Sequence, residues 1–172
     1  MSWTAPKTWN PGDVQSASDL NTYLRDNLLW LLGGFATAYI NYCPAADYTT
    51  TAATFGDVDG VNLSLSLMVH GGRAMVWATF VLEADNTASS SAEADLIADN
   101  TTRAGGADGL VRAQQNNGGT VTILGYWSGL ADGLHNFKLQ FRNVTAGATA
   151  SVRKVNPGAT RGGPITMFGL AW

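Results

Sequence analysis

The chain has 172 residues and a formal net charge of −3, and only 13% of its residues are charged. This is about half the usual ~25%, which excludes a coiled-coil rod and a charged disordered tail. The ten basic residues are scattered, so no basic patch for phosphate is visible and nucleic acid is not an expected partner. The longest apolar run, residues 28–35, is far shorter than the ~20 residues that span a bilayer, so no membrane insertion is expected.

Residues 1–10 read as an extended arm that carries Trp3, Pro6 and Trp9. Two tryptophans on such an arm are costly to leave in water, because each presents a large apolar ring. We therefore expect Trp3 and Trp9 to dock either on the body of this protein or on a neighbouring subunit.

A helix is predicted to follow the arm. Ser16 and Asp19 have the S-x-x-D spacing of a capping box, and Ser18 is the alternative cap. Gly33 and Gly34 are predicted to end the helix. The resulting length of about 14–16 residues is marginal in water, so the helix needs a packing partner.

Four leucines lie on one face of the predicted helix, at spacings of four, four and three residues. They are Leu20, Leu24, Leu28 and Leu31. Two interpretations remain open. The leucines form a short parallel trimeric bundle between copies of the chain, or the helix packs on the protein's own sheet.

The remainder of the chain predicts β-structure, with seven or eight strands separated by turn signals every ~8–12 residues, as in a sandwich or barrel. The alternating or β-rich segments are 35–42, 63–67, 74–82, 121–127, 137–141, 148–155 and 165–172. We expect residues 63–67 and 74–82 to form a hairpin and residues 85–94 to form a polar loop. The last strand is expected to be central in its sheet.

Catalytic and metal-binding patterns are weak. The two histidines, His70 and His135, have no second histidine at ligand spacing, which leaves no zinc motif, and no G-x-S-x-G setting suggests a hydrolytic triad. Residues 57–60 resemble a fragment of a calcium loop but lack its further ligands, so an Asp-Gly turn is favoured. We expect no catalytic residue, no metal site and no cofactor. Cys43 is expected to be a small buried side chain.

A binding hypothesis comes from the aromatic residues. Tyr126 and Trp127 end a predicted strand beside the loop that leads to His135. An exposed aromatic ring beside polar groups could stack on a sugar, which makes these three residues candidate ligand contacts. The more ordinary interpretation is that the aromatic rings pack in the core or in a trimer interface.

Two segments carry a resemblance to a known group of proteins. The first runs Trp3-Thr4-Ala5-Pro6-Lys7-Thr8-Trp9, then Pro11-Gly12-Asp13-Val14, Leu20-Asn21 and Arg25-Asp26-Asn27-Leu28. It resembles the start of many small virion proteins of tailed bacteriophages, which include minor tail, tail fibre and head-associated proteins. The second segment covers residues 130–141 and 147–152. It is similar to the late strands of phage jelly-roll domains, which share their general shape with tumour necrosis factor-like trimers.

The resemblance implies a non-enzymatic, homotrimeric structural protein located in the virion. Residues 1–34 would attach or trimerise, and residues 35–172 would form an antiparallel jelly-roll-like sandwich. The amino-terminal resemblance favours the tail, with the arm contacting other virion proteins and loops 85–94, 100–109 and 114–119 contacting a receptor or host-surface glycan. Alternatives are a capsid decoration or cement protein and a carbohydrate-binding, lectin-like module, and a small glycosidase or lyase is a further one.

Overall fold

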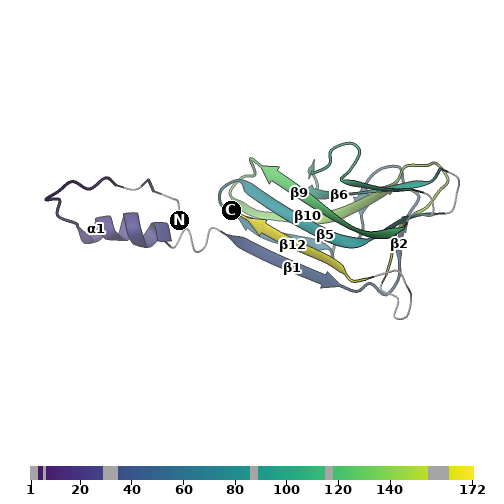
Figure 1. Cartoon of the computed structure of the whole chain (residues 1–172), viewed down its shortest axis with the longest axis horizontal. Coiled ribbons are helices and arrows are strands. Elements are labelled where there is room, and N and C mark those ends of the chain that lie inside the picture. The colour runs from purple at the N-terminus through teal and green to yellow at the C-terminus, as the bar shows by residue number, and fades with distance from the viewer. Residues whose placement is uncertain (1–3, 6, 29–34, 86–88, 115–117, 155–162) are drawn as a thin grey trace.

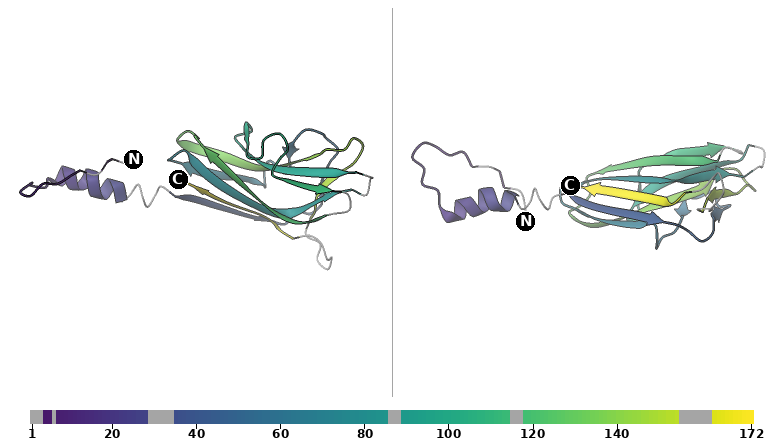
Figure 2. Two further views of the ribbon diagram at one scale, coloured as in Figure 1. Left: turned by 45° about the horizontal axis from the view of Figure 1, so that its top comes forward. Right: turned by 60° about the horizontal axis from the view of Figure 1, so that its bottom comes forward.

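The computed structural model describes residues 4–5, 7–28, 35–85, 89–114, 118–154 and 163–172. Across these residues twelve strands form two antiparallel sheets of six strands each, called sheet A and sheet B. The sheets face each other as a sandwich, and the single helical segment lies beyond one end of it in every view (Figures 1 and 2). The expected fold class, a mainly β antiparallel sandwich preceded by one short helix, is confirmed.

Each sheet is four strands wide, because short strands continue the line of longer ones. Sheet A contains β1 (Ala36–Tyr42), β2 (Tyr48–Thr50), β5 (Arg73–Ala84), β9 (Gly119–Ser128), β11 (Ala150–Val152) and β12 (Ile165–Ala171). Sheet B contains β3 (Gly56–Asp57), β4 (Ser64–Val69), β6 (Ser91–Ala98), β7 (Thr102–Arg103), β8 (Val111–Gln114) and β10 (Gly133–Asn143).

The long strands lie in the order β1-β12-β5-β9 in sheet A and β4-β10-β6-β8 in sheet B. Most connections therefore cross from one sheet to the other, which is the connectivity of a jelly roll. The last strand, β12, lies between β1 and β5, so the prediction that it is central is confirmed.

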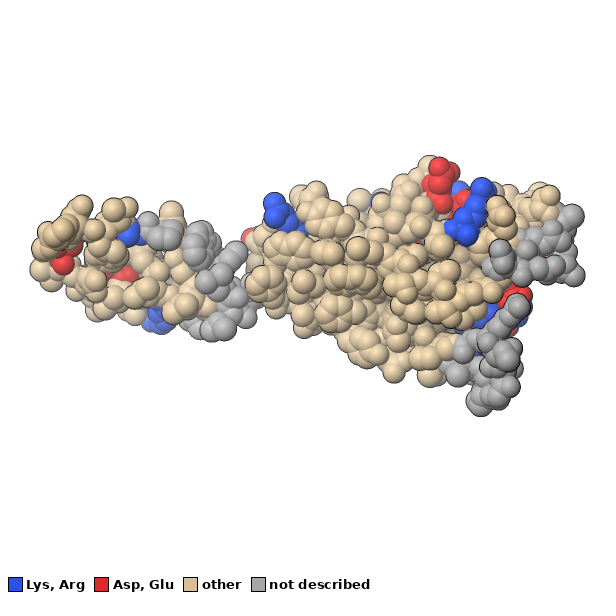
Figure 3. Space-filling view, in the orientation of Figure 1, with Lys and Arg blue, Asp and Glu red and all other residues tan. Residues whose placement is uncertain are grey.

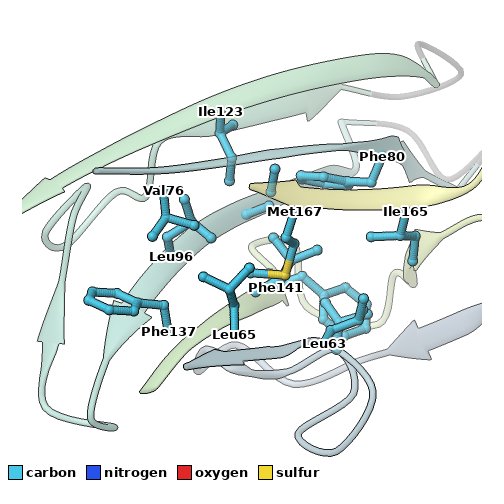
Figure 4. Close-up of a cluster of buried hydrophobic side chains, with 14 of the residues drawn as sticks. Leu63, Leu65, Val76, Phe80, Leu96, Ile123, Phe137, Phe141, Ile165 and Met167 are labelled. Carbon is cyan, nitrogen blue, oxygen red and sulfur yellow. The ribbon is translucent and has the colours of Figure 1, made fainter. Parts of the chain in front are cut away.

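Side chains that alternate along the strands of both sheets fill one core (Figure 4). The largest of them are fully buried and include Phe80, Phe137, Leu63, Leu96 and Met167. Because a strand turns successive side chains to opposite faces, every inward residue has an outward neighbour. The inner sides of both sheets carry apolar side chains, and the two sheets differ in the side chains on their outer sides.

Two sequence-based expectations about the strands are wrong. The segments that contain β4 and β5 do not form a hairpin, because β4 pairs with β10 in sheet B while β5 pairs with β9, β11 and β12 in sheet A. The segment 85–94 is not a loop throughout, because β6 begins at Ser91 and is buried along its whole length. The sequence predicted a loop because this segment alternates small and acidic residues. The groups that pair with its acidic side chains come from distant segments and are not visible in the local sequence.

The helical segment begins where the sequence predicts. The Ser16 side chain accepts a hydrogen bond from the Asp19 backbone N–H, and Asp19 reaches back to Ser16, which confirms the capping box. The helix then departs from the expected α-helix: after α1 (Ala17–Leu20) it widens into a π-helical segment, η1 (Asn21–Asp26). A π-helix of this length is rare, and it does not follow a heptad geometry. Leu31, Gly33 and Gly34 lie outside the described residues.

Candidate assembly surfaces

The arm folds back on the helix. The Thr4 backbone N–H donates to Asn27 Oδ1 at 3.0 Å, and Asn27 Nδ2 donates to the Thr4 carbonyl at 2.8 Å. Lys7 lies 4.5 Å from the ring centroid of Trp9 and 3.5 Å from Asp19. Trp9 is thus partly buried within the arm and helix of its own chain. Trp3 lies outside the described residues.

This packing leaves the leucine side of the helix open. Leu20, Leu24 and Leu28 are 39%, 56% and 56% exposed, and we call these three residues the leucine stripe. Neither the arm nor the sandwich covers them. Of the two interpretations left open by the sequence, packing on the protein's own sheet is therefore not observed for these three residues.

The outer side of sheet A carries a second apolar surface. The strand register places Tyr39, Phe168, Trp77 and Leu124 in one row across all four strands. The next row contains Leu170, Met75 and Tyr126 in the same order. We call these seven residues the aromatic face. The rings of Trp77 and Phe168 lie 5.4 Å apart between centroids.

The aromatic face is uncharged. The row beyond it, Asn41, Thr166, Thr79 and Thr122, is polar but carries no charge, and Thr79 and Thr122 share a hydrogen bond of 2.9 Å. Figure 3 shows this side of the molecule, with charged side chains only around the rim of the sheet. A solvated strand face would carry charged or strongly polar residues at these positions.

The outer side of sheet B is different. There the buried Glu93 accepts hydrogen bonds from Arg142 at 2.8 and 2.5 Å and lies 3.1 Å from Arg112. The ring of Phe55 contacts two guanidinium groups, with its centroid 4.8 Å from Cζ of Arg103 and 4.5 Å from Cζ of Arg142. We call this side, with its ion pairs, the charged face.

Further pairs on the charged face satisfy the remaining charges. Lys138 donates to Asp57 at 2.9 Å, and Gln140 donates to the other oxygen of Asp57 at 2.8 Å. Asp95 is fully buried, which raises the pKa of its carboxyl, although backbone N–H groups of Gly105 and Leu96 and the charge of Arg103 act the other way. Most of these charges are therefore paired within the chain.

The three candidate ligand contacts do not share a site. Tyr126 and Trp127 are consecutive in β9 and so point to opposite sides of sheet A. Tyr126 is half exposed on the aromatic face, while Trp127 is buried in the core, packs on Phe137 at 4.9 Å between ring centroids and donates its indole N–H to the Thr102 carbonyl. Trp127 is therefore not available to a ligand in this structure.

His135 lies in the other sheet, at the start of β10. Its Nδ1 is 2.5 Å from Asp99 Oδ2 and its Nε2 is 2.8 Å from the Ala131 carbonyl oxygen. Burial alone would lower the pKa of His135, but the hydrogen bonds to Asp99 and Ala131 and the charge of Asp99 raise it. Because only the charged imidazole can donate to both oxygens, this geometry favours the imidazolium form and gives His135 a structural role.

The Asp-Gly turn expected at residues 57–60 is also present. Oxygen Oδ1 of Asp59 accepts the backbone N–H groups of Val61 and Asn62, and Oδ2 accepts the Tyr48 hydroxyl at 2.5 Å. Burial alone would raise the pKa of Asp59, but the hydrogen bonds from Tyr48 and Asn62 lower it to about 2. Protein donors thus occupy both of its oxygens.

The loops expected to contact a receptor are only partly described. Leu82 near the end of β5 pairs with Gly119, and Gln114 at the end of β8 pairs with Ser91, so the described residues that flank the loops 85–91 and 114–119 lie at the same end of the sandwich. A polar hollow of about 560 Å³ lies there, lined by Ser89, Ser90, Ser91, Arg112, Gln114, Val144 and Thr145. Residues 100–109 instead contain β7, which pairs with β6 at the edge of sheet B.

Three further findings concern the described residues. No group of three or more His, Cys, Asp or Glu side chains among them is placed to hold a metal ion. Cys43 is exposed, so the expectation that it is buried is wrong. No helix in the structurally described part of the chain is long and apolar enough to cross a bilayer.

Comparison with known proteins gives partial matches. No family model matches the sequence. A segment of 62 residues, 34% of the chain, is 44% identical to part of the extracellular Cu-Zn superoxide dismutase of Onchocerca volvulus, and it spans only 31% of that protein's length. The structure weakly resembles the tripod (BppUct-A-L) from the baseplate of bacteriophage Tuc2009. The TM-score is 0.31, with 12% sequence identity over 98% of this chain and 78% of that chain.

The aromatic face is not evident in the sequence as a surface. Tyr39, Met75, Leu124 and Phe168 did not stand out because each lies in a different strand. One signal was present: residues 74–82 are apolar at nearly every position, whereas a strand with one solvated face alternates. Such a segment indicates a strand that is covered on both sides.

Proposed function

We propose that this chain is a non-enzymatic structural component of a tailed-bacteriophage particle, associated with the tail and assembled as a homotrimer. The observation that carries the proposal is the leucine stripe, an exposed apolar surface on the helix that the arm leaves uncovered. The resemblance of the amino-terminal sequence to small virion proteins supports the same role, and a jelly-roll-like sandwich suits a building block.

The mechanism of attachment would be burial of apolar surface. Each fully buried leucine side chain contributes roughly 1.5–3 kcal/mol relative to an exposed one. Leu20, Leu24 and Leu28 are 39–56% exposed, so burial around a common axis would gain part of this stabilisation for each and would help to order a helix that is marginal alone. The few charged residues of the chain also reduce the cost of removing charges from water on assembly.

The leucine stripe can be tested with the full chain carrying Leu24→Asp and Leu28→Asp. Light scattering of the wild type should give about 54 kDa, three times the chain mass of 18.1 kDa, and the variant should give a lower mass. The matched control carries Val14→Asp and Gln15→Asp, two exposed positions before the helix. A double variant that keeps the full mass would contradict the role given to the leucine stripe.

The virion role needs a separate measurement. Antibodies against the chain should label purified particles of the phage that encodes it, and immunogold microscopy should place the label on the tail. Label on the head would favour the alternative of a capsid decoration protein. Particles that lack the chain would contradict a structural role altogether, and glycan-array binding would then test the lectin-like alternative.

A further inference from the structure

The aromatic face gathers large, exposed apolar side chains on one side of sheet A. Tyr39, Tyr126, Leu124 and Phe168 are 63%, 50%, 43% and 40% exposed, and all four lie on this one side of sheet A. Monomeric proteins expose isolated apolar residues freely, but contiguous apolar patches of several hundred Å² mark an interaction site. Neither the helix nor the arm covers this side (Figures 1 and 3).

The size of the surface matches a protein–protein interface. Strand β5 has twelve residues, which span about 40 Å, and four strands about 4.8 Å apart are about 19 Å wide. The outer side of sheet A therefore covers at most about 760 Å², because β1 and β12 have only seven residues each. A standard interface buries about 800 Å² per partner, so this side could supply most of such an interface.

The charge distribution selects the partner. Between Arg73 and Glu83, which lie at the two ends of β5, each outward side chain of β1, β12, β5 and β9 is uncharged. This part of the surface therefore offers no charged side chain to a partner that binds through ion pairs or phosphate groups. Further copies of the same chain present an equally uncharged and aromatic surface, and three such surfaces that converge on a three-fold axis would not have to remove a charge from water.

We infer that the aromatic face is the surface through which the sandwiches of neighbouring copies of this chain associate. The inference rests on the proposed function, because it names the surface that holds the copies together beyond the leucine stripe. Burial of the row formed by Tyr39, Phe168, Trp77 and Leu124 would place the most apolar part of sheet A at the centre of the contact. Large aromatic residues at such a centre are typical of the residues that dominate binding energy.

The test compares two matched variants of the full chain. In the first, Tyr39→Lys and Leu124→Lys place two charges on the aromatic face. In the second, Leu134→Lys and Met68→Lys place the same charges on the outer side of sheet B, at positions that are 62% and 41% exposed. Circular dichroism and thermal unfolding show whether each variant is folded, and sedimentation equilibrium gives its mass.

We expect the wild type and the sheet B variant to have the same oligomeric mass, and the aromatic-face variant to fall towards 18.1 kDa while its circular dichroism spectrum is unchanged. A folded aromatic-face variant that retains the wild-type mass would overturn the inference, as would a wild type that is a monomer. If the aromatic-face variant does not fold, Tyr39→Ser with Leu124→Ser repeats the test without a charge. The virion role is read independently, from the presence of the chain in purified particles.

Discussion

The outer sides of the two sheets carry side chains of opposite kinds, although their inner sides share one core. On the charged face of sheet B, Glu93, Asp57 and their basic partners form hydrogen bonds within the chain. On the aromatic face of sheet A, the rings of Trp77 and Phe168 pack on each other, while Tyr39, Leu124 and Tyr126 stay about half exposed. The charged groups of sheet B are thus largely satisfied within the fold, whereas the outer side of sheet A leaves apolar side chains in contact with water. We therefore expect changes on the charged face to lower stability and changes on the aromatic face to abolish association.

The largest expected effect on stability comes from Glu93→Gln. Glu93 is almost fully buried and neutralises Arg142 and Arg112, so the variant leaves two cations without their anion. Breaking a buried ion pair costs about 3–5 kcal/mol, and we expect about 2 kcal/mol because both arginines also reach solvent. Urea denaturation of the variant measures this loss in the free energy of unfolding.

The control for this prediction is Glu83→Gln at the rim of sheet A. Glu83 is more exposed than Glu93, and its partner Arg153 still has Asp47 at 2.7 Å. An exposed pair contributes about 0–1 kcal/mol, so this variant should lose less stability. Equal losses in the free energy of unfolding of the two variants would contradict the prediction that the buried ion pairs of Glu93 contribute more than the exposed pair of Glu83.

A smaller effect is expected from pH through His135. Its folded-state pKa is raised by Asp99 and Ala131 above the unfolded value of about 6.5. The stabilisation is therefore fully present below about pH 6.5 and is lost as the pH rises through the folded-state pKa. Thermal unfolding of wild type should show stability falling over this range, and His135→Gln should remove the fall.

The matched control for the pH effect is His70→Gln, which leaves the pair of His135 and Asp99 intact. This variant should keep the fall in stability with rising pH. If His135→Gln retains the same pH dependence as the wild type, the hydrogen bonds to Asp99 and Ala131 do not stabilise the charged imidazole.

The smallest effect is expected from salt, which should leave the oligomeric mass unchanged. At about 1 M salt the Debye length is about 3 Å, so exposed ion pairs are screened. The aromatic face contains no charge, and its association should be the same at about 0.1 and 1 M sodium chloride by sedimentation equilibrium. Dissociation to 18.1 kDa at high salt would show that ion pairs, rather than apolar contacts, join the copies.

The sequence predicted local features well where the cause is local. The Ser16 capping box depends on side chains three residues apart, and the alternation of residues 63–67 gives β4 its inward leucines. Strand β6 was missed because Glu93 and Asp95 find Arg142, Arg112 and Gly105 only in the folded chain. The widening of the helix at residues 21–26 has no evident local signal.

The candidate surfaces show the same division. The leucine stripe could be predicted, because a helix brings residues four positions apart to one side. The aromatic face could not, because Tyr39, Trp77, Leu124 and Phe168 belong to four strands that are distant in the sequence. Their common row exists only through the register of β1, β12, β5 and β9.

The sequence by itself therefore determined that most of the chain forms β-strands, where the helix begins, which leucines lie on one side of it and which alternating residues build the core. The tertiary structure alone decided which strands pair, that β4 and β5 lie in different sheets, and that the apolar outward residues gather on sheet A. The physical reason is that backbone hydrogen bonds between strands are nearly the same for every sequence. The choice of neighbour and register is therefore made by the packing of the whole sandwich.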